Sequence, residues 1–187
     1  MIILEFTGRS QDGSRCRHCS EYETLPHVLG FCSKGYVLRI ARHNQIRSLI
    51  AESLRKMGLT VVEEMICNAT NGSIRRFDIL AMDKNTHIGW IVDPTIRFEM
   101  NVQQADEVNK EKQSIYESCI PDVMIKYKLK NVKVIGLFIG ARGTITRFFE
   151  DFRELFRLPK SLSEEIALTA LKTSIQILNH HLYAPNL

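Results

Sequence analysis

Apolar positions spaced three or four residues apart run from Ile46 to Met57 and stop at Gly58. This spacing places them on one face of a helix, and glycine is the residue that most often follows a helix end. The pattern therefore predicts an amphipathic helix over residues 37–57. A helix with one apolar face needs a second apolar surface to pack against.

The following segments predict that surface. Three stretches rich in β-branched residues are separated by runs of turn-forming residues, and they span residues 60–67, 74–82 and 87–96. They predict three consecutive strands in an antiparallel meander. The third is apolar on both faces from Ile88 to Val92, which is typical of a central strand covered on both sides.

The second half of the chain returns to helical spacing. The pattern predicts a helix over residues 102–119, a buried strand over 130–139, and two helices over about 145–157 and 161–183. Ser161 and Glu164 have the spacing of an N-terminal capping box for the last helix. The predicted fold class is a mixed α/β (α+β) layer, and a sheet of parallel strands alone is disfavoured.

Composition agrees with one ordinary globular domain. The 187 residues are 44% hydrophobic and 25% charged, and no apolar stretch approaches the roughly 18 residues of a membrane-spanning helix. The opening residues lack the features of a secretory signal, so an intracellular protein is expected. The net charge of +4 permits a polyanionic partner. Cys67, Cys119 and the stripe Phe148, Phe149, Phe152 and Phe156 are expected to be core residues.

Three of the five cysteines lie close together before the first predicted helix, with a histidine between them. The motif Cys16-x2-Cys19-x7-His27-x4-Cys32 offers three thiolates and one imidazole, which are ligands of tetrahedral structural Zn²⁺. The spacing predicts a zinc-bound loop. Free, partly buried thiols are the alternative, and His18 is a less suitable ligand than His27 because it adjoins Cys19.

Two aspartates stand on neighbouring predicted strands. Asp78 lies within the second strand and Asp93 ends the apolar run of the third. A lone aspartate in a strand is commonly found at a bulge or at the edge of a sheet. An anion at the end of an apolar strand is nevertheless costly, and a second carboxylate beside it adds repulsion. A bound Mg²⁺ would offset both costs, so the pair predicts a metal site.

Basic residues occupy positions that the helical patterns turn inward. Lys112 fills a gap in the stripe formed by Ala105, Val108, Ile115 and Cys119. Its stem could snorkel past the core, or its ammonium could reach the two aspartates. The inner side of the first helix carries Arg39, Arg42 and His43 near its start. They could support the zinc loop or contact phosphate.

Together these motifs resemble a known family of nucleases. Carboxylates on consecutive strands with an inward lysine are similar to the core of the PD-(D/E)XK superfamily. Cys16 to Cys32 followed by Arg42-His43-Asn44, Arg76-Phe77-Asp78, Val92-Asp93-Pro94-Thr95 and Lys112 to Tyr116 resembles the C-terminal part of site-specific non-LTR retrotransposon polyproteins. There a CCHC zinc knuckle precedes a restriction-enzyme-like endonuclease. The corresponding division here is a poorly ordered lead-in over 1–15, a zinc knuckle over 16–35, and a nuclease domain over 36–187.

The resemblance implies cleavage of DNA that depends on Mg²⁺ or Mn²⁺. It implies that Asp78 and Asp93 hold the metal, that Lys112 orients or activates the attacking water, and that Tyr116 supports it. The DNA contacts expected with it come from Arg39, Arg42, His43, Arg76 and Arg97. Three positions depart from the superfamily pattern: Phe77 replaces proline, Asp93 replaces the more usual glutamate, and Thr95 stands where a lysine is expected.

The first functional hypothesis is therefore an endonuclease that nicks target DNA by phosphodiester hydrolysis, as in target-primed retrotransposition. The alternative is a catalytically inactive module, derived from such a nuclease, that binds DNA or RNA. A protein-interaction fold using the phenylalanine-rich helices is a third reading. The resemblance also implies a nuclear location and a reverse transcriptase domain elsewhere in a larger polyprotein. The sequence leaves open whether the chain forms a homodimer.

Overall fold

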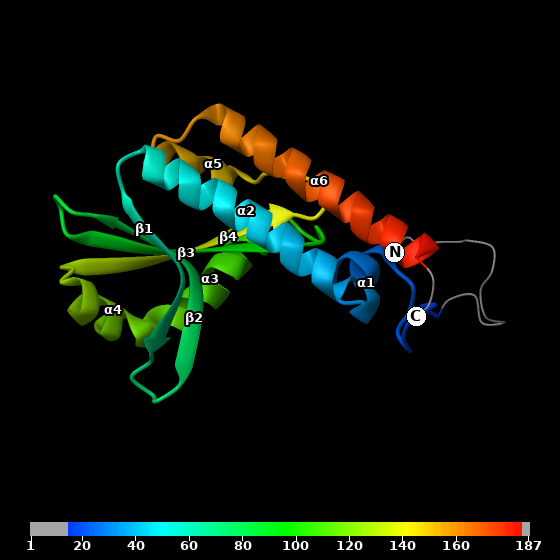
Figure 1. Cartoon of the computed structure of the whole chain (residues 1–187), viewed down its shortest axis with the longest axis horizontal. Helices are drawn as coiled ribbons and strands as arrows, with labels where there is room; N and C mark the ends of the chain where they lie inside the picture. Colours follow the sequence, from blue (N-terminus) through cyan, green and yellow to red (C-terminus); the bar gives the residue numbers. More distant parts are fainter. Residues whose placement is uncertain (1–14, 185–187) are drawn as a thin grey trace.

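The computed structural model describes residues 15–184 and contains one four-stranded sheet (Figure 1). Its strands lie in the order β1 (Thr60–Asn68), β2 (Ile74–Asp83), β3 (Ile88–Arg97) and β4 (Asn131–Gly140). The first three form an antiparallel meander and β4 lies parallel to β3. The mixed α/β prediction is thus confirmed. The predicted lead-in over residues 1–15 lies outside the described residues, except for Arg15.

Helices cover both faces of this sheet (Figure 1). On one face, α2 (Tyr36–Lys56), α5 (Arg147–Leu155) and α6 (Lys160–Tyr183) enclose a core that includes Ile46, Val92 and Phe149. On the other, α3 (Gln104–Tyr116) and α4 (Ile120–Tyr127) enclose a second core that includes Phe77 and Cys119. β3 is therefore buried from both sides, as its sequence predicts.

The core predictions hold at the level of single residues. Cys67, Cys119, Phe149, Phe152 and Phe156 are buried, and Phe148 packs partly buried against the core. No helix among residues 15–184 is both long and apolar enough to cross a bilayer.

The structure contains several short helical elements that the sequence pattern does not predict. The cysteine-rich loop contains α1 (Leu25–Gly30) and the 3-10 turn η1 (Ser33–Gly35). The 3-10 turn η2 (Glu117–Cys119) ends the predicted helix over 102–119, and α4 follows it directly, where no element is predicted. Pro121 lies in the first turn of α4, where a helix tolerates proline because that N–H has no partner within the helix.

The predicted capping box of the last helix is wrong. α6 begins at Lys160 with Pro159 as its N-cap residue, and no side chain caps it. Ser161 therefore lies within the first turn and not before it. The proline ring fixes φ at the N-cap, and the backbone there is extended, with φ −65° and ψ 148°.

Candidate active site and zinc site

The carboxylate of Asp93 is the centre of a buried polar group between β3 and α3. Lys112 Nζ lies 2.9 Å from Asp93 Oδ1, and the hydroxyl of Tyr116 donates to Asp93 Oδ2 at 2.6 Å. Lys112 and Tyr116 stand one helical turn apart on α3, so both side chains leave the same face. The inward direction predicted for Lys112 is confirmed.

Gly136 of β4 explains how a lysine fits between a helix and a sheet. A Cβ added at this glycine would lie 2.8 Å from Lys112 Cγ and 2.8 Å from the carbonyl oxygen of Val108. Gly136 is also the neighbour of Asp93 in the parallel ladder. The absence of a side chain here lets α3 approach β4 closely and leaves the lysine stem a path to Asp93.

Asp78 approaches the same place from β2. It immediately precedes Ile79, and Asp93 immediately follows Val92, the residue with which Ile79 pairs. The sheet thus brings the two predicted aspartates together just beyond Ile79 and Val92, where the pairing of β2 and β3 ends. Burial, followed by the negative charge of Asp78, raises the pKa of Asp93, against the opposing effects of Lys112 and Tyr116.

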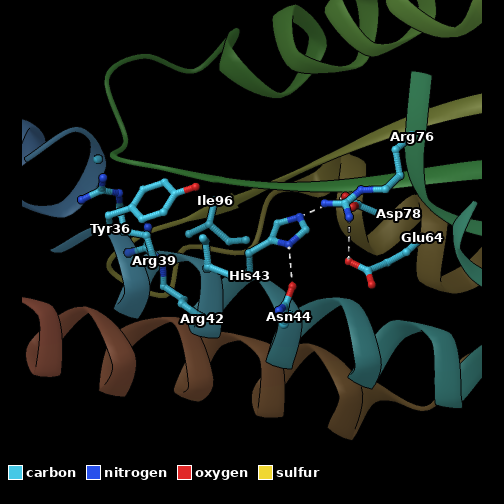
Figure 2. A pocket seen from close by; sticks show the side chains of 11 residues that line it. Tyr36, Arg39, Arg42, His43, Asn44, Glu64, Arg76, Asp78 and Ile96 are labelled. Atoms are coloured by element: carbon cyan, nitrogen blue, oxygen red, sulfur yellow. Dashed lines mark hydrogen bonds and ion pairs between the residues drawn. The ribbon is translucent and has the colours of Figure 1, made fainter. Parts of the chain in front are cut away.

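His43 connects this pair of strands to α2. Its Nε2 lies 3.0 Å from Asp78 Oδ2 (Figure 2). Burial by itself would lower the pKa of His43, but the hydrogen bond and the charge of Asp78 raise it overall. The sequence singled out both residues but gave no indication that they touch, because 35 positions separate them.

An open pocket of about 460 Å³ begins at these residues and extends along the start of α2 (Figure 2). Asp78, His43, Arg76 and Glu64 lie toward one end, and Tyr36 and Arg39 lie toward the other. Arg76 is largely exposed, and its guanidinium is 3.8 Å from Glu64. The pocket gives a solvent-connected route to Asp78.

The remaining predicted basic residues differ in their surroundings. Arg42 is buried, donates to Ser174 Oγ at 2.8 Å and to the Leu29 carbonyl at 3.1 Å, and thereby links α2 to α6 and α1. Arg97 pairs with Glu111 at 2.7 Å. Arg39 donates to the Cys32 carbonyl at 2.6 Å beside the cysteine cluster. Arg39 and Arg42 thus both support neighbouring segments through hydrogen bonds to backbone carbonyls.

The four predicted zinc ligands converge. The donor atoms of Cys16, Cys19, His27 and Cys32 all lie within 4.8 Å of one another. Cys16 Sγ is 3.8 Å from Cys32 Sγ, and Cys19 Sγ is 3.2 Å from His27 Nε2. Two thiolates bound 2.3 Å from one tetrahedral zinc are about 3.8 Å apart, so the cluster fits this metal.

The Cys16 thiol of this cluster is buried. Burial, and then the neighbouring Cys19 and Cys32, raises the pKa of the Cys16 thiol to about 12. Such a thiol is protonated at neutral pH unless a metal replaces the proton. His18 points elsewhere, because its Nε2 donates to the His181 carbonyl at 2.7 Å. His27 is thus the histidine that joins the three thiols.

A buried polar group that the sequence did not indicate lies behind the cluster. Glu23 Oε2 lies 3.3 Å from His181 Nε2 at the end of α6, and Cys16 is close to both. Arg17 makes hydrogen bonds of 2.8 and 3.0 Å to the Glu23 carboxylate. Although burial acts to raise it, these bonds lower the pKa of Glu23 to about 2. No local spacing could reveal this group, since His181 is 158 residues beyond Glu23.

Comparison with known proteins gives one line of evidence. No family model matches the chain. Over 135 residues it is 29% identical to the retrovirus-related Pol polyprotein from the type-1 retrotransposable element R2 of Popillia japonica. The matched segment covers 70% of this chain and 27% of that polyprotein. The chain is thus distantly homologous to part of an R2 polyprotein and spans about a quarter of its length.

Proposed function

We propose that this chain is a metal-dependent DNA endonuclease of the kind carried by R2-type retrotransposon polyproteins. The observation that carries the proposal is the buried contact of Lys112 and Tyr116 with Asp93, next to Asp78, which lines the open pocket. Buried charges that converge on one solvent-connected point are typical of catalytic sites. The distant R2 relationship supports the same reading.

The aspartates suit a hard divalent cation. Their oxygens are the ligands that Mg²⁺ or Mn²⁺ prefers. Burial, followed by the charge of Asp78, raises the pKa of Asp93, and a bound cation would stabilise the charged carboxylate against both effects. Asp78 and Asp93 would hold the ion, which when bound polarises the scissile phosphate and lowers the pKa of a water molecule.

The other residues act through position and charge. The ammonium of Lys112 stabilises negative charge that develops on the phosphate and orients the attacking water. Tyr116 donates a hydrogen bond to Asp93 and so fixes the direction of that carboxylate. His43 does the same for Asp78 from the opposite side of the sheet. Each functional carboxylate thus has a fixed orientation before DNA arrives.

The wider assignments are part of the same proposal. Residues 16–35 form a zinc knuckle that supports the start of α2, and residues 36–187 form the nuclease domain. Arg39, Arg76 and Arg97 contact DNA, while Arg42 supports them from the interior. The protein acts on nuclear DNA as part of a longer polyprotein with a reverse transcriptase domain.

Nicking of supercoiled plasmid by the purified chain tests this proposal. We expect relaxed plasmid with Mg²⁺ or Mn²⁺, none with Ca²⁺ or EDTA, and a loss of about a hundredfold or more in Asp93→Asn. Asp151→Asn on α5, an exposed position, is the matched control and should nick like the wild type. Equal nicking by Asp93→Asn and the wild type would refute the assignment.

One observation favours the alternative of a binding module without turnover. Both aspartates already have protein partners, since Lys112 and Tyr116 contact Asp93 and His43 contacts Asp78. DNA binding that falls steeply with salt, with no nicking under either metal, would support that alternative.

A further inference from the structure

The pocket beside the aspartates extends beyond the residues that the proposed cleavage uses. Its far end is lined by Tyr36, Arg39, Ile40 and Arg42 of α2, with Ile96 of β3 along the wall (Figure 2). The metal and the attacking water require only the end at Asp78. The remaining space is available to another part of the substrate.

The far end of the pocket is positively charged without internal compensation. Arg47, Arg97 and Arg142 each face a carboxylate within 3.3 Å. Within residues 15–184, Arg39 and Arg42 have no carboxylate partner, and their hydrogen bonds go to a hydroxyl and to backbone carbonyls. Two adjacent arginines of this kind favour an anion from outside the protein.

Arg42 adds to the positive potential of the pocket from the interior of the protein. Only 2% of the residue is exposed, and its Nε has no hydrogen-bond partner in the part of the chain that the structure describes. Burial, and then the charge of Arg39, lowers its pKa to about 10, so it stays charged at neutral pH. Because this charge is buried away from water, its electrostatic effect on the pocket is only weakly screened.

Arg39 is the arginine that can touch a ligand. It is only partly buried, and its hydrogen bond to the Cys32 carbonyl uses Nη1, which leaves its other N–H groups available within the part of the chain that the structure describes. Gly35 lies directly against it, since an added Cβ would be 3.0 Å from Arg39 Nη1. The backbone at the start of α2 thus leaves room for this guanidinium.

An exposed aromatic ring lies beside these arginines. Tyr36 is the first residue of α2 and is 61% exposed, and the apolar Ile40 one turn later is 42% exposed. Aromatic rings beside arginines stack on nucleic-acid bases and face their phosphates. A base within a duplex has both faces covered by its neighbours, so only an unpaired base can present a free face to Tyr36.

We propose that this pocket binds one unpaired nucleotide next to the cut site, with its base on Tyr36 and its phosphate on Arg39. The inference rests on the proposed function, because it places the nucleotide beside the phosphodiester that the aspartates address. Its size agrees, since about 460 Å³ lies within the range of small-molecule sites. The protein therefore prefers DNA in which a base near the target phosphate has left the stack.

Binding without cleavage tests the inference separately from the proposed function. The probes are two short duplexes of identical sequence in Ca²⁺ buffer, one fully paired and one with a single unpaired 2-aminopurine. We expect the wild type to bind the second about tenfold more tightly, as for one base stacked on an aromatic ring. The 2-aminopurine fluorescence should fall when the complex forms.

The variants separate stacking from charge. Tyr36→Ala should abolish the preference and the fluorescence change, whereas Tyr36→Phe should keep both because the ring remains. Val37→Ala is the matched control, since Val37 is 73% exposed on the same turn but does not line the pocket. Arg39→Gln should weaken binding to both duplexes and reduce the salt slope by about 1.

Three results would overturn the inference: equal binding of the two probes by the wild type, an unchanged preference in Tyr36→Ala, or a lost preference in Val37→Ala. Plasmid nicking with no preference would refute this pocket assignment and leave the endonuclease intact. A Tyr36-dependent preference without nicking would support the pocket and refute the endonuclease.

Discussion

At the residue scale, the candidate site depends on an ion pair between two residues at otherwise apolar positions. Lys112 occupies an apolar position of a helical stripe, and the structure gives the reason, an ion pair 2.9 Å long with Asp93. Asp93 itself is costly in an apolar strand. The contact of His43 with Asp78 could not be foreseen, because it depends on how α2 crosses the sheet.

The first prediction separates function from stability at Asp93. The raised pKa shows that the folded protein disfavours the charged carboxylate. Asparagine keeps an acceptor for Lys112, and its amide can donate to the Tyr116 hydroxyl, which has the Arg76 carbonyl 3.1 Å away as a second acceptor. In EDTA at neutral pH, we therefore expect Asp93→Asn to unfold at an equal or higher urea concentration than the wild type. A clearly lower midpoint would indicate that the charge serves the fold.

At the element scale, the periodicity of apolar residues predicted the fold class. It did not predict the residues at which helices begin, or the short helices. The strands and long helices lie within a few residues of their predicted bounds, because burial of one or both faces imposes the period. α4 was missed because its eight residues contain a proline. The capping box failed because Pro159 already sets the N-cap conformation.

The close approach of α3 and β4 gives a second prediction. In Gly136→Ala the new methyl group would meet the Val108 carbonyl oxygen and the Lys112 stem at 2.8 Å. We expect a loss of about 1–3 kcal/mol in unfolding free energy, as for overpacking in a core. Gly30→Ala is the control, because nothing lies within 4 Å of its added Cβ. Chemical denaturation of both variants measures the effect, and equal stabilities would contradict the packing argument.

At the scale of the whole molecule, the cysteine-rich loop over residues 16–32 packs against α6. Glu23 meets His181, Arg17 reaches the Leu182 carbonyl, and His18 reaches the His181 carbonyl, so the loop packs on the last turns of α6 (Figure 1). Local spacing predicted the ligands but not this neighbour, because the partners are far apart in sequence. The loop and the helix should therefore lose order together.

Removal of zinc tests that coupling. We expect a chelator to increase hydrogen exchange in residues 16–32 and in the last turns of α6 near residues 177–183, while β2 and β3 stay protected. The reason is that metal binding provides the folding free energy of such a loop. Cys32→Ser should lose the metal and Cys67→Ser should keep it, since Cys67 is a core residue outside the cluster. Unchanged exchange at the end of α6 in zinc-free protein would contradict the coupling.

The central claim is that Lys112 serves catalysis at the buried aspartate, and plasmid nicking by two methionine variants tests it most directly. Lys112→Met removes the charge beside Asp93 while keeping an apolar stem, whereas Lys110→Met changes an exposed lysine of the same helix. With Mg²⁺, and after both variants are shown to be folded, we predict that Lys112→Met loses about a hundredfold or more in nicking rate. Lys110→Met should nick like the wild type. Equal rates for the two folded variants would contradict the assignment.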